Sequence, residues 1–301
     1  MSFSSRAKAE LCQTRLAKKC CAVAESYGAL LYASEFSFRA VRLVTANEAF
    51  AARLPRLFQK AFGLAFDETP PEGAAGKKRF AVTDPEKLRQ IFAAFELSPE
   101  SAALSLHVNF GVLEEDCDRA AFIRGAFLAG GSLTDPEKGF HLELATPHRS
   151  VSRETRSLLM ELGFAAKEAE RAGNCLLYFK KADLIADLLT AIGAPLASMG
   201  VQTAKVEKDM RNTITRRVNC DSANADKVVA AAQEQIEAIR RLVRARGLDA
   251  LPEPLRDTAL LRIANPEASL SDLALLSSPP VTKSCLSHRL RKIAELAQTV
   301  E

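Results

Sequence analysis

Residues 117–128 read CDRAAFIRGAFL, and residues 20–31 read CCAVAESYGALL. Both segments are rich in small residues, follow a helical pattern and carry Gly-Ala at the same position. A glycine inside a helix costs about 1 kcal/mol relative to alanine, so something must offset it. Close approach of the two helices, with Gly28 facing Gly125, would provide that offset, because small side chains let backbones touch. The alternative is a pair of ordinary core helices.

The same order of elements follows each of these segments. After the first come strand-like runs at 40–45 and 79–82 and helical patterns at 57–63 and 85–95. After the second come matching strands at 141–146 and 176–179 and helices at 158–163 and 182–192. Such a duplication predicts an α+β domain over residues 1–204, built from repeats at about 18–97 and 115–195 that are related by a pseudo-two-fold axis.

Composition favours an ordinary globular protein, because 48% of the 301 residues are hydrophobic and 26% are charged. The longest apolar runs are too short for a membrane span, and residues 1–10 lack the apolar core of a signal peptide. We therefore expect a cytoplasmic protein. The seven cysteines contain no C-x-x-C pair, and the four histidines show no metal-binding spacing. We expect reduced core thiols, and neither a zinc site nor another cofactor.

Charge is distributed unevenly along the chain. Residues 1–204 have a net charge of +1, residues 205–246 of +4 and residues 247–301 of −1. We interpret residues 205–250 as a helical linker with a break at 218–221 and a new helix capped by Asn224. This helix should stop at Gly247. Its last turns carry four arginines that suit either phosphate contacts or a solvated helix end: Arg240, Arg241, Arg244 and Arg246.

Residues 251–301 predict an all-α helix-turn-helix domain. A first helix spans about 255–264, and a second begins at a capping-box-like Ser269-Leu270-Ser271-Asp272. Residues 277–281 form the turn, and Thr282 can cap a third helix that runs to about Ala297. The turn contains two prolines, unlike the tight glycine-containing turn of the simplest motif of this kind.

The third helix carries side chains that can bind DNA. Lys283, Ser287 and Arg291 are spaced i, i+4, i+8 and share one stripe, with Ser284 and His288 beside it. Recognition helices read bases mainly from their N-terminal half, so the later basic residues suit the phosphate backbone. A merely solvated amphipathic helix is the alternative. The candidate DNA-binding residues are Ser269, Ser271, Thr282, Lys283, Ser284, Ser287, His288, Arg289, Arg291 and Lys292.

Several longer stretches carry a family resemblance. Residues 124–143, RGAFLAGGSLTDPEKGFHLE, resemble the hallmark segment of the WhiA family. The stretches 268–273, 279–284 and 288–292 resemble its C-terminal domain, and RVNCD at 217–221 resembles its linker. The resemblance covers essentially the whole chain. It implies a pair of LAGLIDADG homing-endonuclease-like repeats followed by a helix-turn-helix similar to the promoter-reading domain of sigma factors.

The resemblance also implies a function. Members of this family act as transcription regulators in Gram-positive bacteria, in sporulation, cell division and chromosome segregation, and some work with a WhiB-type partner. The implied ligand is double-stranded DNA, and the implied location is the nucleoid.

Nuclease activity can be judged from two positions. A LAGLIDADG helix ends in an acidic residue that binds a divalent metal, and alignment places Ala33 and Gly130 there. Neither side chain can coordinate Mg²⁺, which prefers carboxylate oxygens. Glu35 and Asp135 are nearby acids, but Glu35 lies two residues past the position and Asp135 belongs to an Asp-Pro turn. We therefore expect a degenerate nuclease scaffold without a metal.

Three hypotheses result. The first is a DNA-binding regulator without enzymatic activity. The second is an active homing-type endonuclease, which Ala33 and Gly130 disfavour. The third is an interaction protein whose helix-turn-helix docks on RNA polymerase or a sigma factor instead of reading DNA.

Overall fold

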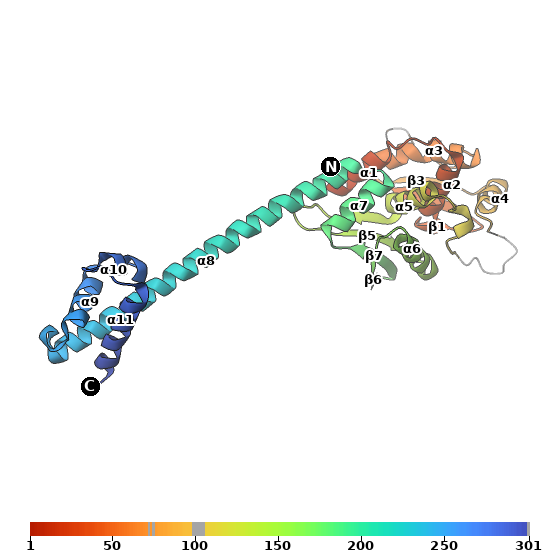
Figure 1. The fold of residues 1–301 in the computed structure, drawn as a ribbon. Coiled ribbons are helices and arrows are strands. Elements are labelled where there is room, and N and C mark those ends of the chain that lie inside the picture. The colour runs from red at the N-terminus through yellow and green to blue at the C-terminus, as the bar shows by residue number, and fades with distance from the viewer. Residues whose placement is uncertain (72, 74–75, 98–105, 300–301) are drawn as a thin grey trace. The chain divides into compact units, whose positions relative to one another are not determined.

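The computed structural model describes residues 1–71, 73, 76–97 and 106–299, and the last two residues of the predicted C-terminal domain lie outside it. The chain divides into two compact units, Met1–Lys208 and Asp209–Glu301, whose elements are labelled in Figure 1. Among the described residues, no helix combines the length and the apolarity that crossing a membrane requires.

The first repeat packs helices on a three-stranded antiparallel sheet of order β1-β2-β3. Strand β2 alternates buried and exposed residues, as a sheet with one covered face should. The predicted helix at 57–63 does end at Gly63, whose φ of 72° is left-handed, but it begins at Glu48 after an Asn47 cap. The elements are α1 Phe3–Leu11, α2 Lys19–Leu31, β1 Glu35–Phe36, β2 Val41–Thr45, α3 Glu48–Phe62, β3 Lys78–Val82 and α4 Pro85–Ala94.

The second repeat has the same order with one added strand, so its antiparallel sheet has four strands in the order β4-β5-β7-β6. Strand β6 was not predicted, because its sequence KEAER is exposed throughout and carries no apolar alternation. The elements are η1 Phe110–Val112, α5 Asp116–Gly130, β4 Gly131–Leu133, β5 Leu142–Thr146, α6 Arg149–Glu161, β6 Lys167–Arg171, β7 Asn174–Phe179 and α7 Ala182–Ile192.

Helices α2 and α5 form the centre of the N-terminal unit and touch through their glycines. A Cβ atom on Gly28 would lie 2.0 Å from the carbonyl oxygen of Phe122. A Cβ atom on Gly125 would lie 2.0 Å from the carbonyl oxygen of Glu25. The predicted contact between the two glycines' helices is therefore confirmed. No larger residue fits at either position without separating the helices.

A buried ion cluster, which the sequence did not predict, joins the two repeats. Glu25 on α2 is fully buried and accepts hydrogen bonds from Arg53 of α3, at 2.6 and 2.9 Å, and from Arg124 of α5, at 2.9 Å. Arg53 also donates to the carbonyl oxygens of Cys12 and Thr14. Arg124 donates to the carbonyl oxygen of the last residue of α7. One carboxylate thus holds helices from both repeats together.

The linker in the structure differs from the predicted one. Helix α8 runs without a break from Pro195 to Arg246, so the predicted break at 218–221 is wrong. Between residues 201 and 246 the chain contains neither proline nor glycine, the two residues that most disfavour a helix. The side chain of Asn224 donates to Cys220 Sγ instead of capping a new helix. Gly247 ends α8 with a φ of 76°, as expected.

The C-terminal unit continues from α8 through a short 3-10 turn into three helices. These elements are η2 Leu248–Ala250, α9 Glu253–Ala264, α10 Leu270–Leu276 and α11 Lys283–Gln298. The end of α8 packs on them through Ile239 and Leu242, which join Leu273, Leu286 and Leu290 in a separate apolar core. The structure therefore shows the predicted α+β domain followed by an all-α helix-turn-helix.

The expectation of core thiols is largely wrong. All seven cysteines are free, but only Cys12 is buried. Cys20 and Cys117 lie in the first turns of α2 and α5, and Cys220 lies on the exposed stretch of α8. Their positions at helix ends and on a helix surface explain why Cys20 and Cys220 are exposed and Cys117 is only half-buried.

Candidate nucleic-acid interface

The helix-turn-helix is held by caps that the sequence encodes locally. Ser269 Oγ accepts from the backbone N–H of Asp272, and the Asp272 carboxylate accepts from the backbone N–H of Ser269, both at 3.2 Å. This capping box starts α10. Thr282 Oγ1 accepts from the N–H of Cys285 at 3.2 Å and starts α11. Both predicted caps are confirmed. The hydroxyl oxygens of Ser269 and Thr282 therefore already have a structural role in starting α10 and α11.

The predicted recognition face of α11 is open to solvent. Leu286 and Leu290 are buried in the core of the unit, which fixes the rotation of the helix. The opposite side of α11 carries side chains that are all exposed: Lys283, Ser284, Ser287, His288 and Arg291. The amino group, the hydroxyls and the imidazole on this face supply donors and acceptors of the kind that contact base edges and phosphates.

The basic residues near the end of α11 lie in different surroundings. Arg291 and Lys292 are exposed and lie 3.9 and 3.4 Å from the Glu295 carboxylate. Arg289 is half-buried and lines a recess of about 650 Å³ between α9 and the turn. Glu253 lines the same recess. The structure therefore groups Arg291 and Lys292 on the outer surface and separates Arg289 from them.

The sequence did not predict that recess. Its walls combine side chains of α9, such as Leu261, with Leu276 at the end of α10 and with Pro279 and Val281 of the turn that follows. Leu275 and Leu276 are 76% and 56% exposed and lie next to each other at the end of α10. The run of two leucines directly before the Ser-Ser-Pro-Pro turn was the available signal, because a short helix cannot bury both of them.

The four arginines at the end of α8 are all exposed. Arg240, Arg241, Arg244 and Arg246 surround the buried Ile239 and Leu242 that attach the helix to the C-terminal unit. Ser271 on α10 is exposed as well. These positions leave the arginine side chains available for phosphate contacts.

A second surface lies in the N-terminal unit, where α2 and α5 end. Ala33 and Gly130, the two positions predicted to match the metal-binding acids of a LAGLIDADG enzyme, line one recess of about 440 Å³. The structure thus brings together the two positions that the sequence alignment paired. No Asp, Glu, His or Cys is among the residues that line this recess in the described part of the chain. The recess offers no group that prefers a divalent metal.

The backbone around Gly130 has also closed. A Cβ atom there would lie 2.6 Å from the carbonyl oxygen of Ala145 and 2.8 Å from the ring of Tyr32. Tyr32 is buried, and burial raises the pKa of its hydroxyl. An acidic side chain at position 130 therefore requires both the ring and strand β5 to move. Position 130 therefore has no free space for a carboxylate side chain.

The two nearby acids are engaged elsewhere. Glu35 forms an ion pair with Arg42 on the neighbouring strand and accepts from Ser37 Oγ. Asp135 accepts the backbone N–H of Glu137 at 3.1 Å, which is the predicted Asp-Pro turn. Neither residue lines the recess of Ala33 and Gly130.

The chain matches two family models. Residues 119–211 match the WhiA LAGLIDADG-like domain, and residues 214–297 match the WhiA C-terminal HTH domain. Proteins named probable cell division protein WhiA from Ruminiclostridium cellulolyticum and Desulfitobacterium hafniense are 34% and 36% identical to it. These alignments cover 100% of this chain and 98% and 97% of the two relatives.

The solved structures that are similar to this one include two of WhiA proteins. The crystal structure of full-length DUF199/WhiA from Thermotoga maritima has a TM-score of 0.61 at 25% identity, covering 100% of this chain and 99% of that one. The N-terminal LAGLIDADG domain of DUF199/WhiA has a TM-score of 0.50 at 21% identity, covering 64% of this chain and 90% of that one. The predicted fold class, an α+β LAGLIDADG-like domain followed by a helical helix-turn-helix, is confirmed.

Proposed function

The chain belongs to the WhiA family, and on that premise we propose that it is a DNA-binding transcription regulator without nuclease activity. The helix-turn-helix of the family supports a DNA-binding role. The observation that carries the proposal is the solvent-exposed face of α11, with Lys283, Ser287 and Arg291 on one stripe above a fully packed apolar side. In this proposal Lys283 to His288 contact base edges, and Arg291 and Lys292 contact the phosphate backbone.

A binding experiment tests the assignment of α11. A genomic DNA fragment enriched by the full chain serves as the probe, and fluorescence anisotropy gives the Kd at one fixed salt concentration. Lys283→Ala and Ser287→Ala should each weaken binding by about 10-fold, because a good side-chain contact to a base contributes about 1–3 kcal/mol.

Arg256→Ala is the matched control for Lys283→Ala. It also removes one positive charge, but Arg256 is paired with Asp249 near the start of α9. Its Kd for DNA should stay within about two-fold of wild type, because Arg256 lies outside α11 and the loss of its exposed ion pair should not disturb the fold. Unchanged affinity in both α11 variants would remove this helix as the reading element.

The proposal that the N-terminal unit has no nuclease activity rests on the recess of Ala33 and Gly130, which has no carboxylate lining and no space at position 130. Hydrolysis of a phosphodiester by a metal enzyme needs the metal held in place by protein ligands. Supercoiled plasmid incubated with the chain and Mg²⁺ should therefore remain uncut. Cleavage that disappears on chelation would overturn this part of the proposal.

We extend the proposal to the processes named for the family. Two relatives carry the name of a cell division protein, and we propose that this chain regulates genes for cell division, sporulation and chromosome segregation while bound to the nucleoid. Genome-wide DNA occupancy of the full chain, compared with a version lacking residues 251–301, tests this. We expect the full chain to occupy sites at genes for these processes and the shortened version to lose them. Identical occupancy maps for the two versions would contradict the proposal.

A second candidate function is docking on a protein such as RNA polymerase, a sigma factor or a WhiB-type partner. The exposed Leu275, together with Leu276 in the wall of the recess that Arg289 lines, favours it. Leu275→Ser should weaken capture of purified polymerase or sigma factor without changing the Kd for DNA. If the α11 variants leave DNA binding intact and Leu275→Ser abolishes capture, docking becomes the main function.

A further inference from the structure

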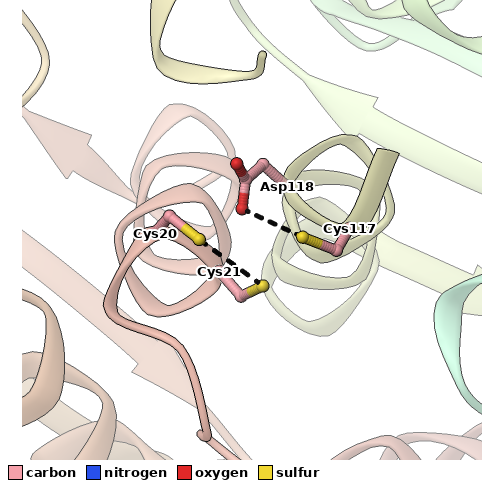
Figure 2. Close-up of side chains that lie close together, drawn as sticks. All are labelled: Cys20, Cys21, Cys117 and Asp118. Carbon is pink, nitrogen blue, oxygen red and sulfur yellow. Dashed lines mark hydrogen bonds between the residues drawn. The ribbon is translucent and has the colours of Figure 1, made fainter. Parts of the chain in front are cut away.

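Four potential metal ligands meet at the end of the α2–α5 pair that is remote from the degenerate recess. Cys20 and Cys21 lie in the first turn of α2, and Cys117 and Asp118 lie in the first turn of α5. Their three Sγ atoms and a carboxylate oxygen all lie within 4.8 Å of one another. Figure 2 shows the side chains converging between the two helices.

The duplication of the domain explains this convergence. Cys117 and Asp118 occupy the same second and third positions of α5 that Cys20 and Cys21 occupy in α2. The contact of Gly28 with the backbone of α5 fixes how closely the two first turns approach. The cluster is therefore assembled from both repeats, so neither repeat contains a recognisable metal motif by itself.

The state of Asp118 is the second observation that points to a cation. The residue is only 3% exposed, its carboxylate accepts from Cys117 Sγ at 3.7 Å, and the thiols of Cys20 and Cys21 lie beside it. Within the described residues, no lysine or arginine forms an ion pair with it. A buried carboxylate requires a compensating positive charge. A divalent cation bound by the neighbouring cysteines would supply it, and the thiol protons would be released to solvent.

The spacing suits a single ion. Ligands at about 2.3 Å from a tetrahedral zinc lie about 3.8 Å apart. Cys20 Sγ and Cys21 Sγ are 4.0 Å apart, and Cys117 Sγ lies 3.7 Å from Asp118 Oδ1. Three soft thiolates with one carboxylate favour zinc over magnesium or calcium, which take oxygen ligands only. We propose that Cys20, Cys21, Cys117 and Asp118 bind one Zn²⁺ ion.

The surroundings balance the charge of such a site. Three thiolates and a carboxylate exceed the charge of Zn²⁺ by two. Lys18 Nζ lies 3.8 Å from Cys117 Sγ, and both helix N-termini direct their dipoles toward the cluster. With four protein ligands the site has no open coordination position, so its role is structural: it fastens the first turns of the two repeats together. This inference is independent of DNA binding.

Cobalt provides a direct test with the reduced, full-length chain after removal of metals by a chelator. Co²⁺ should bind at one equivalent per chain and produce sulfur-to-cobalt charge-transfer bands with the visible bands of a tetrahedral complex. Added Zn²⁺ should abolish these bands by displacement. Zinc should also raise the Tm of the chain, because it binds only the folded state.

Two variants and two controls assign the ligands. Cys117→Ser should weaken zinc binding by more than about 100-fold, beyond the loss typical of an outer-shell partner. Asp118→Asn should retain the charge-transfer bands with weaker affinity. Cys175→Ser and Cys220→Ser remove thiols outside the cluster and should bind like wild type. Circular dichroism of each metal-free variant confirms that it is folded.

Two results would overturn the proposal. One is a reduced wild-type chain that binds no stoichiometric cobalt or zinc. The other is binding that Cys117→Ser leaves unchanged while the variant is folded. If the reduced chain binds no metal and peptide mass spectrometry of the oxidised chain finds a disulfide between Cys117 and Cys20 or Cys21, the cluster is a redox-sensitive bridge instead.

Discussion

At the scale of single residues, Glu25 is the acidic centre of the ion cluster that joins the two repeats of the N-terminal unit. Its carboxylate is the shared partner of Arg53 and Arg124, both of which are nearly buried. Removing one member of a buried ion cluster leaves the other charges without compensation and costs about 3–5 kcal/mol. We expect Glu25→Gln to lower the free energy of unfolding by this amount, measured by urea denaturation followed by circular dichroism.

Glu35→Gln is the matched control for that measurement. The same chemical change removes an ion pair with Arg42 whose side chain is half exposed, and such pairs contribute less than about 1 kcal/mol. Similar losses in both variants would show that the buried cluster adds nothing beyond a surface pair.

Asp67 gives a prediction for pH. Burial opposes its ionisation, but hydrogen bonds from Lys87, Thr83 and Asp84 outweigh it and lower the pKa of Asp67 to about 2. Since this value lies below the unfolded value of about 3.9, the stabilisation is complete above pH 4 and is lost as the pH falls toward 2. The Tm of Asp67→Asn should lie below that of wild type at pH 7, and the gap should close below pH 4. A gap of the same size at pH 2.5 would contradict this account.

At the scale of elements, the contact between α2 and α5 leaves no space for a methyl group. The Cβ atom of Gly28→Ala would overlap the carbonyl oxygen of Phe122, a backbone atom that cannot turn aside. We expect a loss of about 3 kcal/mol, at the upper end of overpacking penalties, despite the helix preference of alanine. Gly139→Ala, where nothing lies within 4 Å, should change the Tm little. Equal Tm values for the two variants would disprove the close packing.

The cap of α10 separates a structural role from a binding role. The Ser269 hydroxyl is already used in the capping box with Asp272. Ser269→Ala should therefore cost about 1 kcal/mol of stability in the C-terminal unit, as removal of an N-cap does. Thermal unfolding of the helical signal measures it. A variant with unchanged stability but much weaker DNA binding would instead place Ser269 in direct contact with DNA.

At the scale of the whole molecule, the positive charge is concentrated where α8 ends. Replacing all four arginines (Arg240, Arg241, Arg244 and Arg246) by alanine should weaken binding to specific and unrelated DNA alike. The slope of log K against log salt should become shallower by about 0.9 for every phosphate that the variant no longer neutralises. Removing the same number of charges from the exposed side chains Arg89, Arg149, Arg153 and Lys167 of the N-terminal unit should leave the slope unchanged. A slope unaffected by the arginine changes would exclude them from the interface.

Much of this molecule could be predicted because its signals are local. The caps at Ser269 and Thr282 act within a few residues of their own backbone, and the apolar seam of α11 follows the period of a single helix. The glycines at 28 and 125 could be recognised because each stands out within its own helical pattern, although the contact that they make joins two helices. Strand β6 was missed because its five exposed residues have no apolar pattern. The break expected in α8 was wrong because polar residues interrupt an amphipathic pattern without preventing a helix.

The sequence by itself therefore determined the α+β domain and the helix-turn-helix, since periodicity, caps and residue identity are readable along the chain. Only the tertiary structure placed Glu25 between two arginines, closed the space at Gly130 and brought Cys20 and Cys21 to Cys117 and Asp118. Each of these depends on how closely two helices distant in sequence approach each other. That distance is set by packing across the two repeats, and no single repeat encodes it.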